Sequence, residues 1–435
     1  MAVSPALNLA ALQAKLANQD IANYTGTNGF TMLNAPLATD AVISTDHDAS
    51  VEILRPITIY DNESDASAND GTVIHLERVM AKVTLTGFDE TTLQMEITGL
   101  PTGYTGYAQL EGWTLDVTNK STKLLHDVTG YGDWFSYYSD ANTTQSRFVA
   151  AAEPYRIYWS VDGNYDGNGY GTAKPNDPTN TQWGDEFNYI ASDAENINWS
   201  TTIGSEKPLY CFENTFDVDN MDEDQTTRIV MKGKYYFTQE SSGDGATNSN
   251  ENAEDPSFFV IGSDEETATY TISAFISKVN EKVTSFLDDT WTPGSTVNAG
   301  TFDSVEGLAT LLGKDATTDA TGLQTLLGAF GSVKYYKNAQ VFYYVTRIEH
   351  FGEELTPWND EIDGKPYEYT AARHLGRYGV VRNNWYELNI TGITGPGEPE
   401  IPDTPDTPDD EETGFVKAAV RILAWSKRVQ DVTLN

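Results

Sequence analysis

The sequence holds a single cysteine, Cys211, so no disulfide can form within the chain. It lies in a strand-like run, "PLYCFENTF", which favours a small core residue over a reactive thiol. Histidine is also scarce: the five residues, at positions 47, 75, 126, 350 and 374, form no close pair. The chain lacks a serine-hydrolase elbow, a phosphate-binding glycine loop and a zinc-protease motif. These absences predict that the protein is not an enzyme and uses no catalytic residues.

Positive charge is in short supply, with 27 Lys and Arg against 65 Asp and Glu, a net charge of −38. A protein with this charge cannot neutralise the phosphates of a nucleic acid, which excludes that class of partner. Electrostatic docking on anionic lipid is disfavoured for the same reason. The charge is typical of a surface exposed to solvent.

Long apolar runs are absent, and none approaches the roughly 20 residues of a transmembrane helix. The opening "MAVSPALNLA" has neither the basic nor the apolar region of a signal peptide. Two expectations stay open: the protein is not exported, or this chain is the processed form of an exported one.

Short alternating runs dominate what is present, for example "TVIHLERVMAKVTLTGF" and "AQVFYYVTRIEHF". Alternation broken by glycine and polar residues predicts β-sandwich domains. Ser4, Pro5 and three leucines predict an amphipathic helix over 5–18. Helically spaced apolar residues predict a helical insertion over 274–330, with Ser304 capping one helix. We expect an N-terminal sandwich over 1–207, with long loops at 127–200, and a C-terminal sandwich over 208–394.

A Pro-rich acidic linker follows over residues 395–414. Its prolines fall every third residue, at 396, 399, 402, 405 and 408. Because polyproline II has three residues per turn, residues 396–408 predict an extended spacer of roughly 40 Å.

The last 21 residues, 415–435, begin with a strand of two distinct faces. One face is small and apolar and suits a groove: Val416, Ala418, Val420, Ile422 and Ala424. The other face mixes large apolar groups with Lys417 and Arg421. Two interpretations stay open: the segment pairs with its own domain, or a groove on another molecule receives it. The long spacer favours the second.

Several segments together resemble a known family. They are "IHLERVMAKVTL", "YCFENTF", "TTRIVMKGKY", "YGVVRNNWYELNITGITGPGEP" and the tail "AVRILAWSKRVQDVTL", in which Leu423, Trp425, Arg428, Val432 and Leu434 are matching positions. These resemble the fimbrillins of Bacteroidales, the structural pilins of type V pili, and most of all the major subunit of the Mfa-type minor fimbriae. The resemblance covers residues 74–435 in the expected order.

The resemblance implies two tandem transthyretin-like β-sandwiches with a C-terminal donor strand. It implies export as a lipoprotein precursor, proteolytic removal of an N-terminal strand, and head-to-tail polymerisation by strand insertion. The expected place is a fimbrium on the cell surface, anchored at the outer membrane, with roles in adhesion and biofilm formation. Expected partners are other copies of the chain, minor tip and anchor subunits, and host or bacterial surface ligands.

One loop resembles the start of a calcium site. Asp162, Asn164 and Asp166 occupy positions 1, 3 and 5 of a calcium loop, but position 12 is Ala173, where the motif needs glutamate. An asparagine- and glycine-rich loop without metal is the favoured interpretation, so no cofactor is expected and calcium is the one ion to test. The alternative function is a calcium-dependent carbohydrate-binding or adhesin module, with its site in the aromatic loops 131–171.

Overall fold

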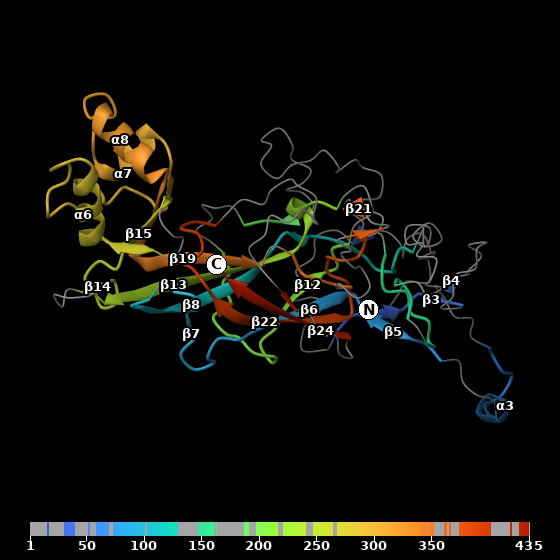
Figure 1. The fold of residues 1–435 in the computed structure, drawn as a ribbon. Helices are drawn as coiled ribbons and strands as arrows, with labels where there is room; N and C mark the ends of the chain where they lie inside the picture. Colours follow the sequence, from blue (N-terminus) through green and yellow to red (C-terminus); the bar gives the residue numbers. More distant parts are fainter. Residues whose placement is uncertain are drawn as a thin grey trace.

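The structure of the chain is a computed structural model, drawn as a ribbon in Figure 1. It describes residues 15–16, 30–39, 51–52, 58–68, 73–100, 102–128, 147–150, 152–160, 162, 187–190, 197–215, 221–240, 247–263, 268–345, 347–351, 361–362, 365–366, 374–401, 418–419 and 426–434. Among these residues, no helix is both long enough and apolar enough to span a bilayer.

The first large sheet joins strands from both ends of the chain. In order across the sheet they are β12 (Leu209–Phe212), β6 (Met80–Thr86), β22 (Asn384–Ile393), β24 (Ser426–Leu434) and β23 (Ala418–Ala419). β22 is parallel to both of its neighbours, β6 and β24. Buried and half-buried residues alternate along β22 from Asn384 to Ile390, as expected for a strand with one face in a core.

The second large sheet is centred on β13 (Arg228–Glu240). Its other strands, all antiparallel to their partners, are β14 (Thr247–Ser249), β8 (Tyr104–Asp116), β7 (Gln94–Glu96) and β19 (Gln340–Val345). The register of β13 against β8 shifts at Gly233, where a β-carbon would lie 2.7 Å from the carbonyl oxygen of Gln109. Glycine is required there because the bulge brings two backbones close together.

The two large sheets share one hydrophobic core, which makes them a β-sandwich. Strands of both sheets supply alternate residues to this core, among them Val83, Leu110, Met231, Val341 and Leu388. Cys211 on β12 belongs to the same core, and burial raises the pKa of its thiol to about 12. The prediction of a core cysteine is confirmed.

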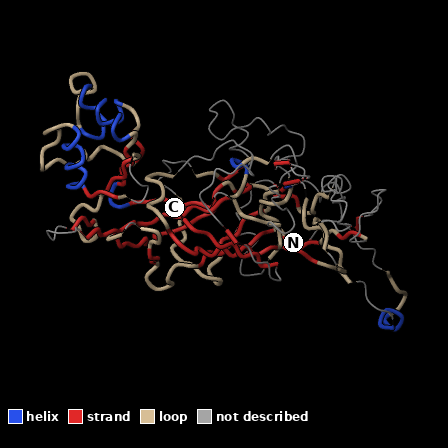
Figure 2. Tube along the Cα trace, in the orientation of Figure 1, coloured by secondary structure: helices blue, strands red, loops and turns tan. Residues whose placement is uncertain are grey.

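A helical lobe is inserted into the second half of the chain and lies at one end of the molecule (Figures 1 and 2). Its elements are β15 (Phe258–Ile261), β16 (Thr269–Thr271), α6 (Ile272–Lys282), β17 (Gly300–Phe302), α7 (Val305–Leu312), α8 (Ala320–Phe330) and β18 (Val333–Tyr336). Phe258 belongs to the sandwich core and Phe259 to the core of the lobe, so β15 joins the two cores. The Ser304 side chain accepts from the Gly307 amide at the start of α7. The predicted helices and this cap are confirmed.

Short strand pairs gather at the opposite end of the molecule from the lobe, along with one six-residue helix (Figure 1). The pairs are β1 (Lys15–Leu16) with β10 (Thr122–Lys123), β2 (Met32–Asn34) with β5 (Leu76–Arg78), β3 (Leu37–Ala38) with β4 (Val51–Glu52), β9 (Thr118–Asn119) with β11 (Phe187–Asn188), and β20 (Glu361–Ile362) with β21 (Lys365–Pro366). The remaining elements are α3 (Glu63–Ala68) and the 3-10 turns η3 (Glu223–Gln225) and η4 (Lys337–Ala339).

Two expectations about the N-terminal half need correction. The helix predicted over 5–18 is wrong at Lys15 and Leu16, which pair as strand β1 with β10, and the rest of it lies outside the described residues. The boundary predicted near residue 208, between 1–207 and 208–394, does not separate the described strands. The reason is that β6 pairs with β12 and β22, and β8 pairs with β13, so that the backbone groups of each are satisfied from beyond residue 208. The tandem transthyretin-like arrangement stays a prediction.

Candidate functional site

The C-terminal segment pairs with its own chain in this structure. β24 lies beside β22, and Ala418 and Ala419 form β23 on the far side of β24. The other members of the predicted groove-facing set, Val416, Val420, Ile422 and Ala424, lie outside the described residues. The longer described strand of the tail is β24 (Ser426–Leu434), which lies beyond the two-faced run predicted from the sequence.

The register of this pairing sets polar residues opposite a buried face. Tyr386 and Leu388 on β22 are 1% and 0% exposed, and their partners on β24 are Arg428 and Gln430. Residues that are paired in a sheet share a face, so a strand built for this core would carry apolar residues at those two positions. Further along the same register, Ile390 and Ile393 are paired with the apolar residues Val432 and Leu434, so the polar partners are confined to the first half of β24.

The first seven residues of the predicted linker, 395–401, are packed on the sandwich, and we call them the linker root. Pro396 and Pro399 are buried, and Ile401 packs with Val230 on the face of the second sheet that points away from the sandwich core. This corrects the expected spacer: two of its five prolines belong to the folded body. One residue of the sequence indicated this packing: Ile401 is the single large apolar residue in an otherwise polar, proline-rich run. The proline and acidic content of that run favoured the interpretation as a spacer.

Five polar contacts hold the linker root in place. The Tyr343 hydroxyl donates to the Gly395 carbonyl at 3.0 Å, and the Tyr336 hydroxyl donates to the Gly397 carbonyl at 2.8 Å. The backbones of Glu398 and Phe342 exchange two hydrogen bonds, of 2.8 and 2.9 Å. The Glu398 carboxylate also lies 2.9 Å from Lys334 Nζ. The linker root therefore pairs with the edge of β19 through an antiparallel bridge, and side chains of β18 bind it as well.

Gly397 fits the root for a steric reason. Its φ of +65° is in the left-handed region that side chains disfavour. A β-carbon at this position would lie 2.5 Å from the Phe342 carbonyl oxygen and 2.8 Å from the Tyr343 ring. Any other residue would push the linker root away from β19.

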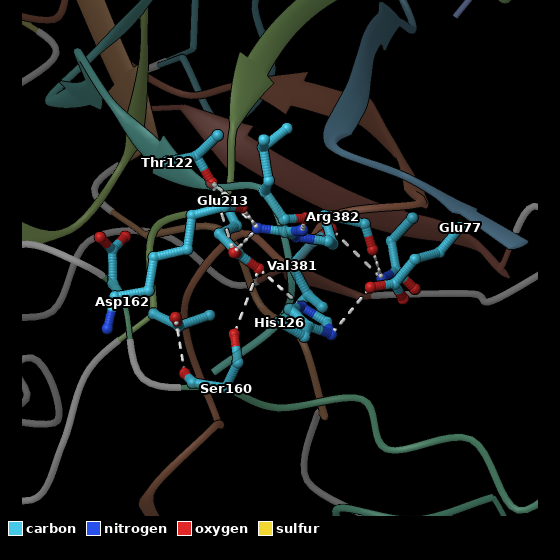
Figure 3. Close-up of polar contacts among 12 residues, drawn as sticks. Glu77, Thr122, His126, Ser160, Asp162, Glu213, Val381 and Arg382 are labelled. Atoms are coloured by element: carbon cyan, nitrogen blue, oxygen red, sulfur yellow. Dashed lines mark hydrogen bonds and ion pairs between the residues drawn. The ribbon is translucent and has the colours of Figure 1, made fainter. Parts of the chain in front are cut away.

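A buried polar cluster lies where several distant segments meet (Figure 3). The carboxylate of Glu213, just after β12, forms an ion pair with Arg382, just before β22. The same carboxylate lies 2.8 Å from Nε2 of His126, whose Nδ1 lies 3.0 Å from Glu77 on β5. Arg156 completes the line, with its guanidinium 3.0 Å from Glu77.

Neutral groups add further hydrogen bonds to this cluster (Figure 3). Ser160 donates to the Glu213 carboxylate at 3.3 Å, and Thr122 accepts from Arg382 at 3.0 Å. The Arg382 guanidinium also donates to the carbonyls of the two residues after Thr122. The cluster therefore cross-links β5, β10 and the ends of β12 and β22.

The charges of the cluster control the ionisation of Glu213. Burial alone would raise the pKa of this carboxyl, but Arg382 and His126 outweigh burial and hold the pKa well below its ordinary value of 4.5. Cations therefore compensate the buried carboxylates, which is the arrangement of a structural cross-link. No sequence motif marked these residues, because each belongs to a different segment.

Asp162 is the one residue of the calcium pattern that lies within the described residues. Asp162 is 2% exposed, and its carboxylate accepts a hydrogen bond from the Asn119 amide. Asn164 and Asp166 lie outside the described residues. In the part of the chain that the structure describes, no three His, Cys, Asp or Glu residues are placed to hold a metal ion.

The aromatic loops 131–171 were the alternative binding site. Four aromatics of this range lie within the described residues, and two of them, Tyr155 and Tyr158, are half-buried. The other two, Phe148 and Trp159, are 1% and 0% exposed, and their rings pack edge-on and tilted against Phe351. These rings pack inside the protein and are not available to stack on a sugar. The other rings of the range that the sequence offered, such as Trp134, lie outside the described residues.

The buried histidines are likewise engaged in packing. His350 Nδ1 lies 2.8 Å from the Tyr386 hydroxyl, and its ring packs edge-on against Phe351.

Comparison with protein families matches the C-terminal part of the chain. Residues 334–431 match the family described as major fimbrial subunit protein type IV, fimbrillin, C-terminal. No match was found among curated proteins. The matched range runs from β18 through β19, β22 and the linker root into β24, so the tail and its root fall within the part of the chain that is similar to fimbrillins, a family of structural pilins.

Proposed function

We propose that this protein is a fimbrial subunit that polymerises by donating its C-terminal segment, residues 415–435, to a groove on a neighbouring copy. The match of residues 334–431 to the fimbrillin C-terminal family supports a fimbrial subunit of this kind. A head-to-tail contact between two different surfaces does not close on itself, so it gives a filament.

The observation that carries the strand-exchange proposal is the contrast between the two runs of the tail. β24, which pairs with β22, offers Arg428 and Gln430 opposite buried positions. The run 415–425, by contrast, has five small apolar residues in strict alternation. In this proposal, pairing through β24 holds the segment in the free subunit, and the apolar face of 415–425 enters the neighbour.

The physical gain comes from completing an open sheet in the recipient. A missing strand leaves backbone N–H and C=O groups unpaired along its groove, and an inserted strand satisfies them. Burying five small apolar side chains contributes roughly 5–10 kcal/mol before the entropy cost of ordering the segment.

The wider setting follows the fimbrillin resemblance. We propose that proteolytic removal of an N-terminal strand opens the groove, and that export leads to a fimbria anchored at the outer membrane. Tip and anchor subunits are the expected partners besides further copies of this chain, and adhesion and biofilm formation are the expected roles.

Truncation after Gly414 tests the proposal. The shortened chain should remain folded and soluble and should fail to form filaments, as seen by electron microscopy and thermal melting. The full-length chain with the N-terminal trimming reproduced is the positive control. Filaments from the truncated chain would rule out assembly through this tail, and loss of the folded state would show that the segment belongs to its own domain.

The spacer provides a second test that leaves the donor strand intact. Deleting residues 402–410, beyond the linker root, removes about 28 Å of reach and should block assembly. Replacing the same nine residues by a polar segment of equal length should restore it. Assembly by the shortened chain would show that the spacer length is not required.

A further inference from the structure

The linker root lies between the last strand of the sandwich core and the segment proposed to carry polymer contacts. β22 ends at Ile393, and Gly395 is already held by the Tyr343 hydroxyl. The segment leaves the described body at Ile401, against Val230 on the second sheet. Once a neighbouring subunit has taken up the tail, a pull transmitted through the linker therefore meets the root before it meets β22.

We propose that the linker root is a mechanical anchor, which passes tension on the tail into β18 and β19 and protects β22 from being peeled off the sheet. The inference rests on the proposed function, because only a polymer places the tail under load. It adds a role for Lys334, Tyr336, Tyr343 and Gly397 that a flexible spacer would not need.

The geometry explains why the anchor matters to β22. This strand is bonded along Trp385–Asn389 to β6, and Thr98 donates to the Ile393 carbonyl at its end. A force applied at the end of a strand breaks such hydrogen bonds one after another. A force applied at Ile401 must first release two tyrosine hydrogen bonds, a backbone pair and an ion pair, which lie within four consecutive residues of the root.

The load then passes into well-connected strands. Phe342, which bridges Glu398, lies in β19, and β19 is paired with β13 from Ile229 to Lys234. Tyr336 and Lys334 lie in β18, which pairs with β15 and β17. Tension is thus shared between the second sheet of the sandwich and the sheet of the lobe.

Gly397→Ala is the sharpest variant, because its β-carbon meets backbone at 2.5 Å. Gly313→Ala is a matched control: Gly313 has φ +64°, almost identical to the +65° of Gly397, but a β-carbon there meets nothing within 4 Å. Both variants suffer the same left-handed strain, and only one displaces the root. Tyr336→Phe is a milder second variant, with Tyr344→Phe as its control. Tyr344 lies in β19, the strand that follows β18, and its hydroxyl bonds none of the described linker residues.

The experiment pulls single full-length monomers in optical tweezers, so it needs no filament. Handles are attached at Glu111→Cys, exposed on β8, and at Thr404→Cys, beyond the root; the native Cys211 is buried and stays unlabelled. The unaltered root should give a short extension step before the sandwich unfolds. In Gly397→Ala that step should occur at least about tenfold faster at equal force, or be lost, while Gly313→Ala keeps it.

Hydrogen exchange gives an independent readout at one atom. The Glu398 amide donates to Phe342 and should be protected, and Gly397→Ala or Tyr336→Phe should raise its exchange rate, with both control variants unchanged. Identical force traces for Gly397→Ala and Gly313→Ala, or a first step that already unfolds β22, would overturn the anchor. Failure of the truncation test for polymerisation would leave these monomer measurements unaffected, so the two proposals fail separately.

Discussion

The Glu213 carboxylate and the Arg382 guanidinium form a buried ion pair across 169 residues of sequence. Removing Arg382 leaves Glu213 and Glu77 in the interior with less positive charge nearby. Arg382→Met should therefore lower the free energy of unfolding by about 3–5 kcal/mol, measured by denaturant titration. Lys334→Met, which breaks a pair about one third exposed, should cost no more than about 1 kcal/mol. Equal losses in the two variants would contradict a structural role for the cluster.

Acid should destabilise the protein partly through Glu213. Because its pKa in the folded state is depressed below 4.5, its contribution to stability is fully present above pH 4.5 and is lost as pH falls toward the folded pKa. Glu213→Gln should be less stable than the native chain at pH 7, and its stability should fall less steeply between pH 4.5 and pH 2. Thermal melts across this range measure both slopes, and parallel slopes would show that Glu213 is not the group responsible.

Cys211 should be unreactive in the folded protein. Burial in the sandwich core raises its pKa to about 12, so hardly any thiolate exists at pH 8. A thiol reagent such as dithionitrobenzoate should label it fully in denaturant and only at the rate of unfolding in buffer. Cys211→Ala should melt lower because a core volume is lost, yet remain folded. Rapid labelling without denaturant would place Cys211 at an accessible site.

Substitutions in the tail should separate its two faces. Val420→Asp would carry an unpaired carboxylate into an apolar groove, at a cost of several kcal/mol, and should stop filament growth. Lys417→Asp, on the opposite face, should have a milder effect. Electron microscopy measures the filament length of each variant. The melting temperature of each monomer shows whether the variant is folded. Equal loss of filaments in both variants would mean that 415–425 does not enter a groove in the predicted orientation.

Calcium should bind weakly if at all, and Asp162 should act in packing. Asp162→Ala removes the acceptor for the Asn119 amide and should lower stability by about 1–3 kcal/mol. Calorimetry with Ca²⁺ should give the same weak signal before and after the change. A submicromolar site that disappears in Asp162→Ala would revive the calcium-dependent adhesin hypothesis.

Local patterns in the sequence predicted what depends on neighbouring residues. The helices of the lobe follow from apolar spacing at three and four residues, and Ser304 was recognisable as a cap because its partner, Gly307, is three residues away. Alternation likewise identified the strands and hence a mostly β fold.

Contacts between distant segments were not predictable in this way. The boundary near residue 208 does not divide the described strands because β6 takes β22 as a neighbour, and no local pattern encodes that choice. The polar cluster joins Glu77, His126, Glu213 and Arg382 from four segments. The linker root was hidden by its composition: proline and glutamate predicted an extended spacer, while the tyrosines that hold it lie some 50 to 60 residues earlier.

The pairing of β6 with β22 also sets the order in which the molecule can be completed. Thr86 contacts Leu388 across 302 residues, so the first sheet stays open until nearly the whole chain has emerged. Contacts between residues this far apart in sequence slow folding, because the entropy cost of closing the long loop is incurred before the hydrogen bonds between its ends can form. Until then β6 has an unpaired edge, which is prone to join other chains. A chain with this topology is therefore prone to aggregate during synthesis, and pairing of β22 with β6 removes that exposed edge.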